Sequence, residues 1–123
     1  MRLDRLDVHA RFSEIVVHGR TVYLSGQVPE RTSDGDISIQ TADVLALIDA
    51  HLARAGTDRA HLLSATIYLV DLKRDYVNMN AVWDRWLPPG CAPARTTVGV
   101  VALANPAYLV EITCTAALPE ATA

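Results

Sequence analysis

The sequence is short of the features that mark several large protein classes. Aromatic residues make up only 6% of the 123 residues, and 11 Lys and Arg against 14 Asp and Glu give a net charge of −3. A surface that tracks nucleic-acid phosphates needs clustered positive charge, which this composition does not supply. Apolar runs fall far short of the roughly 18 residues of a membrane span, and no signal-peptide segment is recognisable. We therefore expect no nucleic-acid partner, no membrane span and a cytoplasmic location.

Cysteine is scarce, and the common motifs of metal and cofactor sites are missing. Cys91 and Cys114 do not form a C-x-x-C motif and are too few for a disulfide scaffold, so we interpret them as free thiols. The four histidines are scattered and lack the spacing of a zinc site. Glycine-rich dinucleotide and P-loop motifs are absent, as is the G-x-S-x-G motif of serine hydrolases. The sequence therefore predicts no metal site and gives no support for these cofactor classes.

Apolar residues, by contrast, make up 50% of the chain and are enough for one core, so we expect residues 1–123 to form a single domain with a loose tail at 119–123. Alternating apolar runs predict strands at residues 3–8, 15–17, 21–25, 62–70, 96–101 and 108–116. A hairpin turn is expected at Gly19. Helical periods predict a helix over 37–55, started by Asp36 or Ser38 and ended by Gly56. A second helix is expected from near Asp75 to Pro88.

This order of elements predicts an α+β fold, a mixed, mostly antiparallel sheet of about six strands with both helices on one face. In the first helix, Gln40 and His51 are expected on the side away from the apolar stripe. In the second, the stripe is expected to contain Tyr76 and Trp83. Strand alternation predicts that Val98 and Val100 face the helices, together with Val22, Leu24, Ile67, Leu69, Val110 and Ile112.

The opposite face of the sheet is expected to carry Tyr23, Ser25, Tyr68, Val70, Val101, Leu109, Glu111 and Thr113. Two helices cannot cover both faces of one sheet, and this second face is too apolar to remain in water. The sequence therefore predicts a homo-oligomer that buries it.

Three polar residues stand where the pattern expects apolar ones. Asn80 falls on the stripe of the second helix. A functional amide and an amide that only binds nearby backbone groups are equally good interpretations. Glu111 lies in the middle of a strand. A carboxylate there is either buried, with an ion-pair partner or a function, or it faces solvent on an edge strand. Arg95 opens a strand, and its planar guanidinium suits a carboxylate. A structural Arg95–Glu111 pair is the alternative to a ligand site, and both would place the two side chains close together.

Four segments together resemble the RidA (YjgF/YER057c/UK114) family. They are Tyr23-Leu24-Ser25-Gly26-Gln27-Val28-Pro29, Asn78-Met79-Asn80, Pro93-Ala94-Arg95-Thr96-Thr97-Val98 and Val110-Glu111-Ile112. They follow the family's order and spacing over nearly the whole chain. The resemblance implies a chorismate-mutase-like fold assembled as a homotrimer, with a cleft between each pair of neighbouring subunits.

The resemblance also implies an activity, the hydrolysis of reactive enamine or imine carboxylates to 2-keto acids and ammonia. Arg95 is similar to the arginine that holds the substrate carboxylate, and Glu111 to the residue that orients or activates water. Ser25 and Gly26 would line the cleft, and Asn80 would help to shape it. The partner implied is a small carboxylate-bearing substrate, and no metal or organic cofactor is needed.

Two positions depart from the family's usual residues. Phe12 stands where many members carry a tyrosine, and Thr97 stands where the archetype has a cysteine. Both positions would line the substrate site, so the departures bear on substrate choice. Two alternatives therefore accompany the deaminase. One is an enzyme for a dedicated catabolic or biosynthetic intermediate, such as an aminomuconate-like compound. The other is a non-catalytic module that binds small carboxylates or acts as a chaperone.

Overall fold

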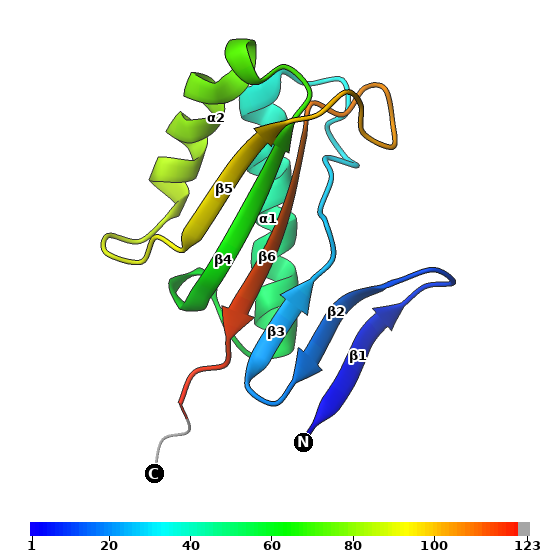
Figure 1. The fold of residues 1–123 in the computed structure, drawn as a ribbon, viewed down its shortest axis with the longest axis vertical. Coiled ribbons are helices and arrows are strands. Elements are labelled where there is room, and N and C mark those ends of the chain that lie inside the picture. The colour runs from blue at the N-terminus through cyan, green and yellow to red at the C-terminus, as the bar shows by residue number, and fades with distance from the viewer. Residues whose placement is uncertain (121–123) are drawn as a thin grey trace.

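The computed structural model describes residues 1–120, and residues 121–123, most of the expected tail, lie outside the described part. A six-stranded sheet has both α-helices packed on one of its faces (Figure 1). In chain order, the elements are β1 (Leu3–Val8), β2 (Ser13–His18), β3 (Thr21–Leu24), α1 (Ile37–Ala55), a short 3-10 helix η1 (Arg59–His61), β4 (Leu62–Leu69), α2 (Leu72–Trp86), β5 (Ala94–Gly99) and β6 (Val110–Ala117). The α+β class predicted from the sequence is confirmed.

The spatial order of the strands is β1-β2-β3-β6-β4-β5. Only β4 and β5 pair in parallel, while the other neighbours pair antiparallel. Parallel neighbours need a connection that crosses back over the sheet, and α2 supplies it. The connection makes β5 an edge strand that lies beside α2 (Figure 1).

Local residue choices explain where the elements turn and end. Gly19 has a φ of 61° in the two-residue connection between β2 and β3, a conformation that suits glycine, so the predicted hairpin is confirmed. The Asp36 carboxylate accepts from the backbone N–H of Ile39 at the start of α1, and Gly56 ends the helix with a φ of 90°. The bounds of α1 follow the prediction from the sequence.

The hydrophobic core lies between the helices and one face of the sheet. Alternate residues of the strands point into it, so buried and half-buried residues alternate along β6. The largest completely buried apolar side chains are Ile15, Leu45, Ile48, Leu52, Ile67, Leu69, Met79 and Ile112. This layer fixes the position of both helices on the sheet.

The prediction for the first turn of α2 was wrong. The helix begins at Leu72 rather than near Asp75, because the Asp71 side chain accepts from the N–H of Arg74 and caps the helix one turn earlier. The buried side of α2 is formed by Asp75, Met79 and Trp83. Tyr76 is instead 42% exposed, and Asn80 is half-buried outside this buried set.

Gln40 was also expected on the wrong side of its helix. It is completely buried in α1. Its amide group donates to the carbonyls of Ser33, Gly35 and Ala107 and accepts from the backbone N–H of Leu109. An amide replaces an apolar group here because four backbone groups of two loops need partners.

The orientation expected for β5 was wrong as well. The parallel register places Thr97 beside Ile67 and Gly99 beside Leu69, and both partners face the helices. Val98 therefore points to the opposite face, where it is 37% exposed, and Val100 lies beyond the end of the strand. The prediction assumed that the apolar residues of this strand face the core. The inward positions of β5 are instead polar or small.

The second face of the sheet is covered by neither helix in residues 1–120 (Figure 1). Tyr23 and Tyr68 lie on it as predicted, together with Glu111, Thr113 and Val98. Tyr23 is 47% exposed. We call this surface the uncovered face. No helix in the described residues is long and apolar enough to cross a membrane.

Candidate active site

Arg95 lies on the edge strand β5, and strand register decides where it points. Its partner on β4 is Ala65, which is buried under the helices. Directly paired residues share a face of a sheet, so Arg95 points toward the helix layer, as Thr97 does. The Arg95 guanidinium carbon lies 5.5 Å from the centre of the Trp83 ring, a favourable contact for a planar cation.

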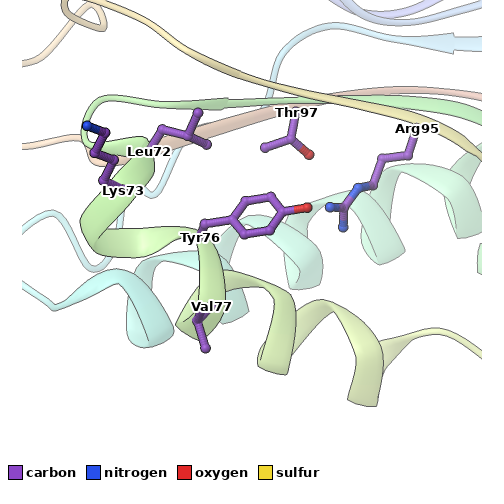
Figure 2. Close-up of a pocket in the computed structure, with 6 residues that line it drawn as sticks. All are labelled: Leu72, Lys73, Tyr76, Val77, Arg95 and Thr97. Atoms are coloured by element: carbon purple, nitrogen blue, oxygen red, sulfur yellow. The ribbon is translucent and has the colours of Figure 1, made fainter.

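A pocket of about 520 Å³ opens between α2 and β5 at this point. Figure 2 shows the Tyr76 ring crossing it, with its hydroxyl group directed toward the side of Arg95. The pocket combines apolar surface with few polar groups, as small-molecule sites commonly do. Its lining residues are Leu72, Lys73, Tyr76, Val77, Arg95 and Thr97.

Two polar groups of this pocket lack partners within residues 1–120. The ion pairs of the described chain do not include Arg95. The Thr97 hydroxyl is buried and makes no hydrogen bond. A buried polar group without a partner costs about 1–3 kcal/mol, so proteins rarely keep one without a reason. A bound ligand would supply the missing partner.

Glu111 lies elsewhere. It pairs with Tyr68 on β4, so its side chain is on the uncovered face. Burial raises the pKa of its carboxyl above the ordinary value, and no described neighbour opposes that shift. A carboxyl group with a raised pKa can take up and release a proton closer to neutral pH.

The expected proximity of Arg95 and Glu111 was wrong for a single chain. The two residues point to opposite faces of the sheet, and β4 lies between their strands. The structural ion pair considered from the sequence therefore does not form within one chain. One cleft can contain both side chains only if they come from two copies.

Ser25 and Gly26, by contrast, do lie with Glu111. The segment after β3 continues alongside β6, because Gln27 and Ile112 exchange backbone hydrogen bonds of 2.8 and 3.1 Å. A Cβ on Gly26 would lie only 2.1 Å from Oε2 of Glu111. Glycine is therefore needed for the carboxylate to rest against the backbone here.

A polar network beside Ser25 was not predicted. Glu14 Oε1 accepts from Ser25 Oγ at 3.0 Å and from Gln27 Nε2 at 3.2 Å. Its Oε2 lies 3.0 Å from His9 Nε2. Burial alone would raise the pKa of Glu14, but the hydrogen bonds from Gln27, Ser25 and His9, with the nearby His51, lower it. These residues come from separate segments, so no sequence spacing could have indicated the network.

The remaining predicted residues are spread around this region. Phe12 is 52% exposed, with its ring centre 5.0 Å from that of His9. It shares a second pocket, of about 450 Å³, with Glu14. Asn80 on α2 is not among the residues that line the Arg95 pocket. The structure therefore brings Arg95 together with Thr97, and Glu111 with Ser25 and Gly26, but leaves Asn80 and Phe12 apart from the Arg95 group.

The two cysteines differ in burial. Cys114 is buried, and burial raises its pKa to about 12. Cys91 is half-buried in the loop before β5. Within residues 1–120, His, Cys, Asp and Glu side chains form no group of three that could hold a metal ion.

Comparisons with known proteins give consistent matches over almost the full length. The family described as Endoribonuclease L-PSP matches residues 2–118. The RutC family protein YoaB of Escherichia coli (strain K12) is 46% identical over 118 residues, which cover 96% of this chain and 100% of that protein. A RutC family protein of Haemophilus ducreyi is 43% identical, covering 94% of this chain and 97% of its own.

Solved structures agree. NMB1025 from Neisseria meningitidis, described as a member of the YjgF protein family, superposes with a TM-score of 0.93 at 45% sequence identity. The superposition covers 98% of both chains. The similarity therefore includes the segments that carry Arg95, Gly26 and Glu111.

Proposed function

The chain belongs to the Endoribonuclease L-PSP family, which includes the RutC and YjgF proteins, and we propose that it is an enamine/imine deaminase. In this proposal it hydrolyses a 2-enamine or 2-imine carboxylate to a 2-keto acid and ammonia. The observation that carries the proposal is the Arg95 guanidinium, which has no acidic partner in the described chain and lies in the wall of a pocket.

Arg95 would bind the substrate carboxylate. A guanidinium can donate two parallel hydrogen bonds to a carboxylate, which fixes both position and orientation. The stacking contact with Trp83 holds the guanidinium in place before the substrate arrives. Thr97, with its unpartnered hydroxyl, offers a further hydrogen bond in the same pocket.

Glu111 would manage the protons. An enamine substrate first tautomerises to the imine, gaining a proton at carbon and losing one from nitrogen. The water oxygen then adds to the C=N carbon, the π electron pair moves to nitrogen, Glu111 takes a proton from the water, and the nitrogen takes a proton from solvent. The resulting carbinolamine then collapses: the C–N bond breaks, ammonia leaves with the electron pair of that bond, and the hydroxyl proton is lost as C=O forms. Glu111 can return its proton to the departing nitrogen, and its raised pKa favours this role.

A shared site requires assembly, and we propose a homotrimer with its sites between subunits. Arg95 and Glu111 point to opposite faces within one chain, so a neighbouring copy must supply one of them. The uncovered face supports this arrangement, because Tyr23 and Val98 expose apolar surface that a neighbour would bury. The free cysteines support a reducing compartment, the cytoplasm, as the place of the reaction.

The experiment is a coupled assay in which a pyridoxal-phosphate lyase releases the imine and 2-keto acid formation is followed. We expect the wild-type protein to accelerate this step. Arg95→Ala should reduce the rate constant about 100-fold, since it removes two charge-assisted hydrogen bonds. Arg85→Ala, an exposed arginine on α2, is the matched control and should retain the rate. No acceleration by the wild-type protein, or full activity of Arg95→Ala, would contradict the proposal.

Phe12 favours a second candidate, a deaminase for a dedicated catabolic or biosynthetic intermediate such as an aminomuconate-like compound. Its half-exposed ring lines a pocket that also contains Glu14, and an aromatic wall suits a larger unsaturated substrate. Rates measured with small aliphatic imines and with longer unsaturated ones would separate the two candidates. A preference for the longer substrates that disappears in Phe12→Ala would favour this candidate.

A non-catalytic module would use the same arginine. It would bind 2-keto acids in a calorimeter and give no acceleration in the coupled assay, whereas the proposed enzyme gives both. The family's description names an endoribonuclease, but the net charge of −3 gives no support for binding the phosphates of RNA.

A further inference from the structure

Five polar side chains converge where β3 ends. Glu14 comes from β2, Ser25 and Gln27 from the segment after β3, His51 from α1, and His9 from the turn before β2. His51 Nε2 lies 3.1 Å from Gln27 Oε1, and Gln27 is only 5% exposed. The deaminase proposal assigns no task to Glu14, Gln27 or His51.

The directions of these hydrogen bonds are fixed by chemistry. The Gln27 amide nitrogen can only donate, and it lies 3.2 Å from Glu14 Oε1. Gln27 Oε1 can only accept, so His51 Nε2 carries the hydrogen of that contact. The Gln27 contact therefore requires Glu14 Oε1 to be an acceptor. An ionised carboxylate provides one, in agreement with the lowered pKa of Glu14.

The ionised Glu14 carboxylate determines whether the Ser25 hydroxyl donates or accepts a hydrogen bond with a ligand. Its single hydroxyl hydrogen is donated to Glu14 Oε1 at 3.0 Å. The two hydrogens of the Gln27 amide nitrogen are shared among Glu14 Oε1, the Ser25 carbonyl at 3.1 Å and Ser25 Oγ at 3.3 Å, so at least one lone pair of Ser25 Oγ stays free. The free lone pair of Ser25 Oγ can only accept a hydrogen bond. A ligand at this position must therefore bring an N–H or O–H group.

The position of Ser25 gives this property a use. The next residue, Gly26, has the Glu111 carboxylate against its backbone. For a ligand that also reaches Glu111, an acceptor on the residue before Gly26 favours an imine or amine nitrogen, which carries hydrogen, over the carbonyl oxygen of a keto acid, which carries none. The same group would therefore hold the substrate and disfavour the product.

We propose that Glu14 is a positioning residue that holds the Ser25 hydroxyl as a hydrogen-bond acceptor for the substrate nitrogen. The proposal rests on the deaminase function for the identity of the ligand. Glu14 itself does not touch the substrate and acts through Ser25. Gln27 and His51 keep the carboxylate in place from the side of α1.

The first test is a double-mutant cycle in the coupled assay. Glu14→Ala and Ser25→Ala should each lower the rate constant about tenfold, and the double variant should be no slower than either one. A residue with only a structural role would lower the rate by the same factor whether Ser25 is present or not. Such additive losses would overturn the proposal. Asp84→Ala, an exposed carboxylate on α2, is the control and should match the wild type.

The second test does not depend on turnover. In Glu14→Ala the freed Ser25 hydroxyl can donate to a keto oxygen, so 2-oxobutyrate should bind roughly fivefold more tightly by calorimetry. Glu14→Gln keeps an acceptor oxygen and is the control, which should bind 2-oxobutyrate as the wild type does. Glu14→Leu removes the acceptor but keeps the volume, should bind it as Glu14→Ala does, and serves as the second variant if Glu14→Ala folds poorly. Unchanged affinity in Glu14→Ala would overturn the proposal. An inactive wild type with this affinity change would instead remove only the deaminase function.

Discussion

The two faces of the sheet differ in what they contact, although the same strands build both. On β4, Ile67 is completely buried beneath the helices, while its neighbour Tyr68 lies on the uncovered face. The covered face has alternating apolar residues and large buried side chains. The uncovered face carries hydroxyl groups, Glu111 and partly exposed apolar residues such as Tyr23. The contrast indicates that the covered face stabilises the fold, apart from the Arg95 pocket at its edge, while the uncovered face carries Glu111 and is not needed for the core of one chain.

The strongest test of this contrast removes core volume. Ile67→Ala should lower the free energy of unfolding by about 2–5 kcal/mol, because it leaves a cavity in a packed core. Thr66→Ala, its neighbour on the opposite face, should change that energy by less than about 1 kcal/mol. Urea unfolding at several protein concentrations would measure both and separate assembly from folding. Equal losses at every concentration would contradict the contrast.

The second test places a charge on the uncovered face. Val98→Asp should dissociate the proposed homotrimer while leaving the fold of the subunit intact, because a buried unpaired carboxylate is costly in an interface. Light scattering after size exclusion gives the mass, and circular dichroism gives the fold. Ala50→Asp, exposed on α1, is the control and should retain the wild-type mass. A Val98→Asp protein with the wild-type mass would show that this part of the face is not an interface.

The third test compares two carboxyl groups by pH. Burial raises the pKa of Glu111 above 4.5. The free energy of unfolding that Glu111 contributes therefore decreases as the pH rises from 4.5 through the raised value. Glu14 behaves in the opposite way. Burial opposes the shift, but hydrogen bonds from Gln27, Ser25 and His9 lower its pKa, so its stabilisation is present above 4.5 and is lost as the pH falls through the lowered value.

Unfolding free energies from about pH 3 to about pH 8 would therefore separate the two residues. Glu111→Gln should be more stable than the wild type at neutral pH, and Glu14→Gln less stable. Both differences should shrink toward acidic pH. Differences of the same sign at neutral pH would contradict the assignment of opposite environments.

The smallest effect concerns the thiols. Cys114 lies on the covered face, and burial raises its pKa to about 12, so almost no reactive thiolate forms. Iodoacetamide at about pH 8 should modify Cys91 and leave Cys114 unmodified until denaturant is added. Peptide mass spectrometry reports each site. Early labelling of Cys114 would show that the covered face opens in the native protein.

The sequence predicted local elements better than the way in which they pack. The bounds of α1, its caps Asp36 and Gly56, and the turn at Gly19 follow from local signals, and all were confirmed. The orientation of β5 was predicted wrongly because its inward residues, Arg95 and Thr97, line a pocket instead of filling the core. Periodicity assumes that inward positions are apolar, and a binding site breaks that assumption.

The candidate site was predicted only as far as single segments allow. Glu111 was found from its place in the strand pattern, and Ser25 and Gly26 from the family resemblance; the structure brings the segment of Ser25 and Gly26 alongside Glu111. The Glu14 network depends on His51, which lies on a different element and is brought near by tertiary packing. The separation of Arg95 from Glu111 depends on strand register, and a one-residue change of register reverses a side chain.

The contact between Gly26 and Glu111 has a consequence for protein engineering. A side chain at position 26 would occupy the space of the Glu111 carboxylate, since a Cβ there would come within 2.1 Å of Oε2. A side chain at position 26 is therefore compatible with Glu111 only if the Glu111 carboxylate moves. A library that randomises position 26 alone will displace the carboxylate in almost every member, whereas one that shortens residue 111 at the same time can explore new shapes for the cleft.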